Sequence, residues 1–357
     1  MSELKTAPAQ ITPQWLTDTL RRNGHLSQGK VVSVDIKEAH KHHFALAVTY
    51  SADVPNSPPQ DLILKWYSGD YPYGLQEALF FDQIAPAMSS PPLPTCYAAK
   101  ADWANKQAYI LLEDLSATHY VAQSPYDDLS MEIFEQVVDA YAEIHAYWWE
   151  HPRINQRDIL RAVGVGIAHE AISPETIRHN QQYFGETALP KRIDQFAAQF
   201  SREQQKLCQR VIASWADLFI HRIASGKGLT LIQGDAQLGN VLLPRNPQRD
   251  RTIIIDWEGC IRGVGVWDLA RTLIQTEFSS PVRQKLERAL LTRYQARLAE
   301  QGICYSIEDC YADYRLSVIA NIPHALSYEG YSYLESAIRA FRDWNCEKLL
   351  DDDIYIT

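Results

Sequence analysis

Three side chains that suit phosphoryl chemistry lie close together in the sequence. Asp235 stands directly after Gly234, Asn240 follows five residues later, and Asp256 ends an apolar run. An aspartate can orient a hydroxyl group and accept its proton. Carboxylate and amide oxygens are ligands that Mg²⁺ takes from proteins. We therefore expect Asp235 to be catalytic and Asn240 and Asp256 to bind a metal.

Short apolar runs on both sides of these residues predict the elements that hold them. Residues 241–243 and 252–255 are rich in Val, Leu and Ile, which is typical of strands, and residues 244–251 between them are polar and rich in turn formers. Gly234 and Gly239 flank the catalytic residues and permit tight turns. The pattern predicts that Asp235 lies on a short loop and Asp256 at the end of a strand.

The same segments carry a family resemblance. The chain contains Q-G-D-A-Q-L-G-N at 233–240 and I-D-W-E at 255–258, and further similar segments at 142–148 and 265–270. This combination resembles the aminoglycoside phosphotransferase and choline kinase superfamily. The resemblance implies an α+β, protein-kinase-like fold of two lobes. It predicts a small N-terminal lobe of antiparallel sheet that binds nucleotide, residues 1–113, and a larger helical lobe for catalysis and substrate, residues 114–357.

The resemblance also implies a cofactor and the residues that bind it. We expect ATP with Mg²⁺, and we expect Lys65, at the end of the strand 62–67, to contact the phosphates. Glu77, on a helix over 74–84, is the best partner for Lys65, and Asp82 is the alternative. The strand 109–115 ends at a predicted hinge between the lobes, where Glu113 and Leu115 would face the adenine. Lys65 taken alone could instead be an exposed strand-end lysine.

The sequence departs from the family pattern in two places. Gln233 stands where the family has a histidine, and the turn 38–43 that would cover the phosphates contains no glycine. Glutamine can still donate and accept hydrogen bonds. These departures leave a catalytically silent nucleotide-binding module as the alternative to an enzyme. We expect Asp268 to brace the catalytic loop, and His145, on a helical apolar stripe, to be a structural core residue.

Composition excludes several other classes of protein. The 357 residues carry a net charge of −10, with 46% hydrophobic and 22% charged residues, which fits a globular protein and argues against a nucleic-acid or anionic-membrane binder. No apolar run suits a membrane span, residues 1–10 carry no secretion signal, and no C-x-x-C pair suggests zinc. We predict a cytoplasmic protein, either a monomer or a homodimer, with reduced thiols.

The acceptor is expected to be a small hydroxylated molecule bound by the helical lobe. Helices are predicted over 13–22, 204–223, 282–298, 307–319 and 331–350. The segment 324–333 is rich in aromatic residues and carries an acid. It could cage a cation, stack on a sugar or ring, or simply pack between helices. Aminoglycoside, choline-like amine, macrolide, sugar and sugar-nucleoside acceptors therefore all stay open.

Overall fold

The chain divides into two compact units. The computed structural model describes residues 11–55, 59–69, 71–122, 129–155, 160, 166–169, 173–276, 278–328 and 330–351. The first unit comprises Met1–Tyr120 with Pro244–Glu258, and the second comprises Val121–Leu243 with Gly259–Thr357. The sequence predicts a single boundary after residue 113, with residues 244–258 in the second lobe. In the structure the first unit extends to Tyr120 and also includes Pro244–Glu258. The N-terminal residues 1–10, where we expected no secretion signal, lie outside the described residues.

The first unit is built on a five-stranded antiparallel sheet with the order β1-β2-β3-β5-β4. Its strands are β1 (Val31–His40), β2 (His43–Tyr50), β3 (Asp61–Ser68), β4 (Cys96–Asp102) and β5 (Gln107–Glu113). The predicted strand 62–67 is therefore confirmed. The strand predicted over 109–115 ends at Glu113, and β4 was not anticipated.

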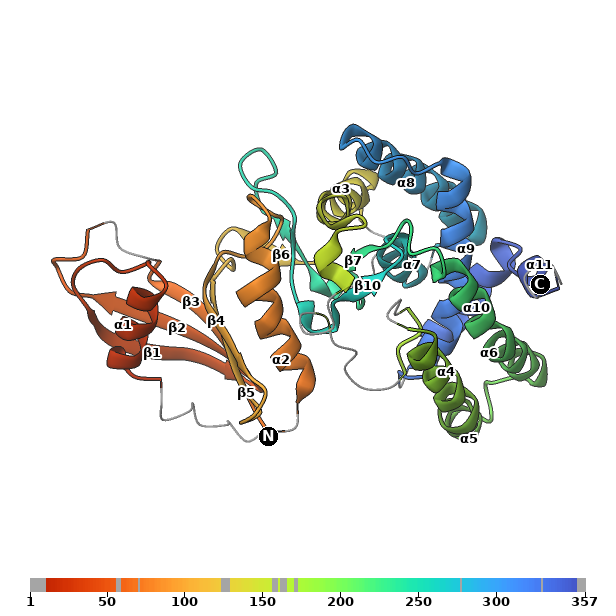
Figure 1. Cartoon of the computed structure of the whole chain (residues 1–357), viewed down its shortest axis with the longest axis horizontal. Helices are drawn as coiled ribbons and strands as arrows, with labels where there is room; N and C mark the ends of the chain where they lie inside the picture. The colour runs from red at the N-terminus through yellow and green to blue at the C-terminus, as the bar shows by residue number, and fades with distance from the viewer. Residues whose placement is uncertain are drawn as a thin grey trace. The chain divides into compact units, whose positions relative to one another are not determined.

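Two helices cover opposite faces of this sheet, because successive side chains of a strand point to opposite sides. Leu62 and Leu64 of β3 are buried in a cluster with Leu16 and Leu20 of α1 (Pro13–Arg22). Lys65, the residue after Leu64, faces the other way, toward α2 (Pro72–Leu79), which packs on β3, β4 and β5. Figure 1 shows α1 and α2 on either side of the sheet.

Local sequence explains where these two helices begin and end. Thr12 caps α1 by accepting a hydrogen bond from the Trp15 amide, and Pro13 occupies its first position, where no amide hydrogen is needed. The helix predicted over 74–84 begins earlier, at Pro72, and continues past Leu79 as a π-helical turn, η1 (Phe80–Ile84), followed by a short turn, η2 (Ala85–Ala87).

The second unit is mainly helical. Its helices are α3 (Met131–Trp148), α4 (Pro174–Tyr183), α5 (Leu189–Gln195), α6 (Arg202–Ile223), α7 (Val266–Ile274), α8 (Ser280–Glu300), α9 (Ile307–Ala325), α10 (Tyr331–Asp343) and α11 (Glu347–Asp351). Short helical turns occur at η4 (Pro152–Asn155), η5 (Phe184–Ala188) and η6 (Leu238–Asn240). The helix predicted over 331–350 is interrupted after Asp343, and the others are confirmed within a few residues.

Short strands frame the segment that carries Asp235. Strand β7 (Thr230–Ile232) precedes it and pairs antiparallel with β10 (Ile261–Gly263). The remaining strands are β6 (His119–Val121), β8 (Val241–Pro244) and β9 (Ile253–Ile254), and η7 (Trp257–Gly259) follows Asp256. The strands predicted on both sides of residues 244–251 are thus present.

The core of the second unit forms around the predicted apolar stripe of α3. The stripe is buried throughout and comprises Phe134, Val137, Val138, Tyr141, Ile144, His145 and Trp148. Helix α3 packs on α8 and on β7, whereas α7 packs on α8, α9 and α10. Helix α7, which follows Asp256 in the sequence, is therefore enclosed by other helices. In the described part of the chain, no helix has both the length and the hydropathy that crossing a bilayer requires.

Candidate active site

In the first unit, Lys65 is held by a buried glutamate. Its Nζ lies 2.7 and 2.9 Å from the two carboxylate oxygens of Glu77, which is 0% exposed. Tyr67 points to the same face of the sheet and donates its hydroxyl to Glu77 Oε2 at 2.9 Å. The structure therefore pairs Lys65 with Glu77, as the helix position predicted, and Lys65 is not an exposed edge residue.

The charges around Lys65 favour its protonated form. Burial by itself would lower the pKa of this lysine, but Glu77 and Asp256 outweigh burial and raise it. Lys65 Nζ lies 3.3 Å from Asp256 Oδ1. A compact ammonium that stays charged while buried is suited to an anionic group such as a phosphate.

Asp256 lies in an unusual backbone conformation after β9. Its φ is +62°, in the left-handed region that non-glycine residues seldom occupy, and its side chain is 33% exposed. The next residue, Trp257, is fully buried, stacks on Phe80 with ring centroids 4.3 Å apart, and donates its amide to Glu77 Oε1 at 3.3 Å. Packing of Trp257 thus holds the strained turn, and the Asp256 carboxylate stays partly accessible.

Glu258 contacts other side chains of the first unit and is not simply a solvated surface acid. Its Oε2 accepts a hydrogen bond from the Tyr71 hydroxyl at 2.8 Å. Burial and the negative charge of Asp256 raise the pKa of Glu258 to about 7. The residue therefore belongs to the same cluster of charges as Lys65, Glu77 and Asp256.

The predicted hinge residues have structural partners. The side chain of Glu113 accepts the Thr95 amide at 2.7 Å, which ties the end of β5 to the loop before β4. The carbonyl of Leu115 accepts the amides of Thr118 and His119 in a turn. These contacts use the Glu113 side chain and the Leu115 carbonyl, so the proposed contact with adenine would fall to other backbone groups of this segment.

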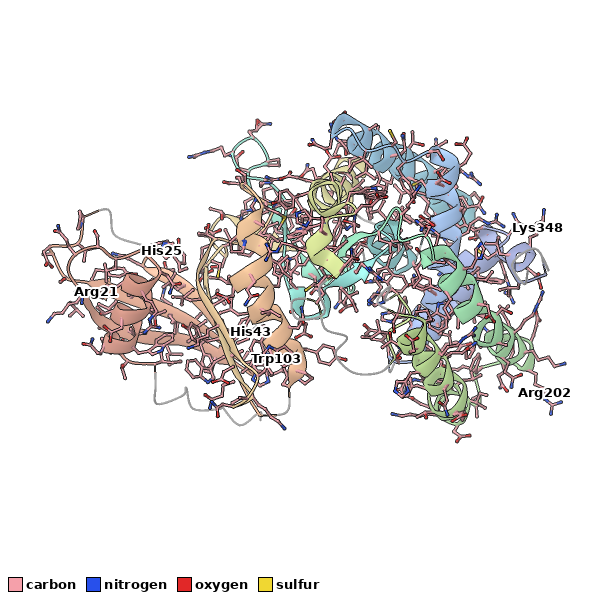
Figure 2. The ribbon with its side chains drawn as sticks, viewed as in Figure 1. Arg21, His25, His43, Trp103, Arg202 and Lys348 are labelled. Carbon is pink, nitrogen blue, oxygen red and sulfur yellow. The ribbon has the colours of Figure 1, made fainter. Side chains whose placement is uncertain are left out.

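The turn predicted to cover the phosphates is a tight hairpin. Strand β1 ends at His40, β2 begins at His43, and Lys41 between them has a φ of +51°. His43, labelled in Figure 2, is exposed, and it pairs in register with Lys65 of the neighbouring strand. The hairpin therefore brings an imidazole next to the buried ammonium.

In the second unit, a buried aspartate holds the loop that carries Asp235. Asp268, near the start of α7, accepts the Gln233 amide at 2.7 Å and the Gly234 amide at 3.0 Å. It also contacts His145 Nε2 at 3.2 Å, and His145 Nδ1 lies 2.9 Å from the Tyr294 hydroxyl. The bracing role of Asp268 and the structural role of His145 are both confirmed.

The loop itself requires a glycine. Gly234 has a φ of +89°, and a Cβ added there would lie 2.4 Å from the carbonyl oxygen of Gly259. The Trp267 indole donates to the Gly234 carbonyl at 2.7 Å, and Thr272 donates to the Ala236 carbonyl at 2.7 Å. Three side chains of α7 therefore bind the loop backbone and leave little freedom for Asp235.

Asp235 is surrounded by hydrogen-bond donors. Its Oδ1 accepts from Arg271 at 2.9 Å and from the Tyr328 hydroxyl at 3.3 Å, and its Oδ2 accepts from Gln237 at 3.0 Å. The amide nitrogen of Asn240 donates to the Asp235 carbonyl at 2.9 Å. This bond leaves the amide oxygen of Asn240 as the atom that suits a metal.

Arg271 and the tyrosines are functional candidates that sequence reasoning missed. Arg271 lies four residues after Trp267 on α7, so the two side chains share a helix face, and both reach the catalytic loop. That spacing was a usable signal. Tyr328 belongs to the aromatic segment 324–333, but its contact with Asp235 joins residues that are far apart in sequence; Glu329 of that segment lies outside the described residues.

The predicted site residues thus form two groups, one in each unit. Lys65, Glu77 and Asp256 meet in the first unit. Asp235 and Asn240 meet in the second. The catalytic, nucleotide-binding and metal-binding roles of these residues stay predictions.

Comparison with known proteins identifies a family and a fold. The family model described as "Ecdysteroid kinase-like family" matches residues 71–303, more than half of the chain. A search of curated proteins gives no match.

Three solved structures share the fold. Choline kinase LicA from Streptococcus pneumoniae is 15% identical, with a TM-score of 0.50, over 88% of this chain and 94% of that chain. An aminoglycoside 2′-phosphotransferase-IIIa mutant in complex with GDP is 11% identical, with a TM-score of 0.51, over 94% and 98%. An ethanolamine kinase from Plasmodium vivax is 8% identical, with a TM-score of 0.52, over 90% and 82%.

At these identities the structural likeness shows the fold, and the predicted two-lobed, α+β, protein-kinase-like architecture is confirmed. The predicted superfamily of aminoglycoside phosphotransferases and choline kinases is confirmed as well. Within it, the chain belongs to the Ecdysteroid kinase-like family.

Proposed function

We propose that this chain is a phosphotransferase that moves the terminal phosphoryl group of ATP, with Mg²⁺, to a hydroxyl group of a small molecule. The observation that carries the proposal is the rigid, partly exposed carboxylate of Asp235. Asp268 and Trp267 hold its loop by backbone hydrogen bonds. Such positioning is what phosphoryl transfer asks of a protein, because there is little covalent chemistry to perform.

Asp235 would orient the acceptor hydroxyl and accept its proton. The Tyr328 hydroxyl already donates to Asp235 Oδ1, which shows that a hydroxyl group can reach this oxygen. The hydroxyl group of an acceptor would donate a similar hydrogen bond to Asp235. The hydroxyl oxygen would then attack the terminal phosphorus of ATP, and the bond between that phosphorus and the bridging oxygen of ADP would break. ADP would leave, and the hydroxyl proton would pass to the Asp235 carboxylate.

The residues of the first unit suit a nucleotide. We propose that Lys65, oriented by Glu77, binds the phosphates, and that the segment from Glu113 to Leu115 lies against the adenine. The GDP complex of a structural neighbour supports nucleotide binding in this fold. The residue types do not distinguish ATP from GTP, and the proposal of ATP follows the family resemblance.

The donor set fits a magnesium ion. We propose Asp256 and Asn240 as its ligands, because a partly exposed carboxylate and an amide oxygen are hard oxygen donors, and Mg²⁺ in kinases takes one or two such ligands with the phosphates. When bound, the metal would neutralise charge on the phosphates. The remaining chemistry belongs to Asp235 and Lys65.

The acceptor is proposed to be a small hydroxylated compound. The structural neighbours carry names that imply choline, ethanolamine and aminoglycoside acceptors, and the family name points to ecdysteroids. A silent nucleotide-binding module is the alternative, which Gln233 favours. All four residues expected of an active kinase (Lys65, Asp235, Asn240 and Asp256) are nevertheless present.

Two matched variants test the proposal. We expect Asp235→Asn to lower acceptor-dependent ADP release by about a hundredfold or more, because the amide cannot take the proton. ATP with Mg²⁺ should still raise its melting temperature. Lys65→Met should instead lose that stabilisation, since the phosphate contact is gone. Turnover would be measured with choline, ethanolamine, aminoglycosides, sugars, macrolides and ecdysteroids.

The outcomes separate the two functions. Acceptor-dependent ADP release by the wild type, absent in Asp235→Asn, supports the enzyme. Unchanged turnover in Asp235→Asn excludes the assigned role of Asp235. Stabilisation by ATP with no product from any acceptor favours the silent module.

A further inference from the structure

A buried arginine lies directly beside the proposed catalytic carboxylate. Arg271 is 3% exposed, and its Nη2 lies 2.9 Å from Asp235 Oδ1. The guanidinium carbon lies 4.4 Å from the ring centroid of Tyr333 and 5.4 Å from that of Tyr328. Both distances are within the range of cation–π contacts. The positive charge of Arg271 is thus held by one carboxylate and two aromatic rings.

These three partners are the groups that would otherwise attract a cationic substrate. An ammonium group is bound in proteins by carboxylates and by the faces of aromatic rings. Here Asp235, Tyr328 and Tyr333 already surround a cation that belongs to the chain. A second positive charge brought to Asp235 would be repelled by Arg271, and burial makes that repulsion stronger than it is in water.

Among the residues that the structure describes, the other titratable groups next to this cluster do not supply a compensating negative charge. His324 contacts both tyrosine rings, and His169 contacts His324. Burial keeps the pKa of both histidines well below the ordinary value, so both are neutral. Asp268 is turned away and is occupied by two backbone amides and His145.

We propose that the acceptor of this enzyme carries no positive charge near its reacting hydroxyl, and that Arg271 is the residue that excludes cationic acceptors. The inference rests on the proposed kinase function and narrows its substrate class. Choline-like amines and aminoglycosides fall outside this class. Uncharged, oxygen-rich acceptors fall within it.

The remaining donors of Arg271 favour an acceptor that contains a second oxygen. Among the residues that the structure describes, Nε and Nη1 have no hydrogen-bond acceptor. Both atoms are shielded from solvent, so an acceptor oxygen would reach them only after neighbouring side chains move. An arginine presents its donors in one plane. An oxygen bound to Nε or Nη1 would therefore lie close to a hydroxyl group bound to Asp235.

The first test fractionates a metabolite extract by charge at neutral pH. The material retained on a cation exchanger is separated from the rest, and each fraction is incubated with the wild-type protein, Mg²⁺ and ATP labelled in the terminal phosphate. We expect labelled product only from material that the cation exchanger does not retain. Product from the retained fraction alone overturns the inference and leaves the kinase standing. No product from either fraction overturns the proposed function, and the inference with it.

The second test changes the charge of residue 271 and uses matched acceptors. The pairs are choline and its uncharged analogue with a tert-butyl group in place of trimethylammonium, and glucosamine and glucose. We expect wild-type kcat/KM to favour the uncharged member of each pair by about tenfold or more. Arg271→Met should reduce this preference by about tenfold, because Asp235 and the two rings then face an empty cation site. Arg271→Lys keeps the charge and should keep the preference.

A control separates charge from loss of structure. Arg222 is also partly buried and paired with an aspartate, Asp313, but it contacts neither Asp235 nor the tyrosines. Arg222→Gln should leave the ratio between paired acceptors unchanged even where it lowers stability. Equal ratios in the wild type and Arg271→Met, or a preference for the cationic member in the wild type, would refute the role of Arg271. If Arg271→Met does not fold, the preference of the wild type within each pair still decides whether cationic acceptors are excluded.

Discussion

Two buried cations, Lys65 and Arg271, illustrate what single residues contribute. Lys65 is paired with Glu77 and close to Asp256, and Arg271 is paired with Asp235. A buried charge without a partner is costly, so each cation also determines where its carboxylate points. By contrast, the exposed pair of Lys37 and Asp61, with both side chains 55% exposed, has little influence on geometry.

Buried neutral histidines should make the protein sensitive to acid. His169 is 4% exposed and stacks on Trp267 with ring centroids 4.2 Å apart. Burial and the nearby Arg271 lower its pKa to about 3. The unfolded chain binds this proton below about pH 6.5, whereas the folded chain does not. Stability is therefore full above pH 6.5 and is lost as the pH falls toward 3, by about 2 kcal/mol at pH 5 from His169 alone.

His169→Phe keeps the stacked ring and removes the titrating group. We expect the urea-unfolding free energy of this variant to depend less on pH between about pH 7 and pH 5 than that of the wild type. The exposed His179→Gln serves as the control and should leave the dependence unchanged. Equal acid losses in the wild type and His169→Phe would show that His169 is not the group responsible.

At the scale of elements, helix α7 organises the loop that carries Asp235, the proposed catalytic residue. Asp268, Trp267, Arg271 and Thr272 all bind the segment from Gln233 to Ala236. The side chains come from one helix, so the loop and the helix form one rigid piece. A substitution that pushes the loop and the helix apart should therefore lower the free energy of unfolding.

Two glycines with similar backbone angles test this close approach. Gly234 has a φ of +89°, with the Gly259 carbonyl in the space of a Cβ, whereas Gly226 has a φ of +66° and open space around it. Gly226→Ala should cost about 1 kcal/mol from backbone strain alone. We expect Gly234→Ala to cost at least about 2 kcal/mol more in urea unfolding, because backbone must also move. It should lower turnover as well; similar costs at both positions would mean that the loop can shift freely.

Prediction from sequence succeeded where the signal was local or carried by a motif. The bounds of α1, the stripe of α3 and the pairing of Lys65 with Glu77 follow from periodicity and from the order of strand and helix. Strand β4 was missed because it has mixed polarity and depends on pairing with β5. The contacts of Tyr328 with Asp235 and Arg271 join distant segments, which no local pattern encodes.

At the scale of the whole molecule, the first unit is discontinuous in sequence. Its sheet is complete by Glu113, but Pro244–Glu258 also belongs to it. This segment contributes Asp256 to the environment of Lys65 and a fully buried indole, Trp257, to the core. The chain thus returns to the first unit and adds Asp256 to the charged pair of Lys65 and Glu77.

The returning segment should be necessary for the first unit to fold. Trp257 stacks on Phe80 with parallel rings, its amide binds Glu77, and the Ile254 amide donates to the Pro92 carbonyl at 2.9 Å. Loss of a buried tryptophan typically costs about 3–5 kcal/mol, a large part of the stability of a small domain. A fragment of residues 11–120 should therefore unfold without a cooperative urea transition. The same fragment joined through a flexible linker to residues 244–258 should unfold cooperatively, and Trp257→Ala in the joined fragment should abolish that gain. Cooperative unfolding of residues 11–120 alone would show instead that the sheet and α2 are sufficient for folding. Residues 244–258 would then not be required for the first unit to fold.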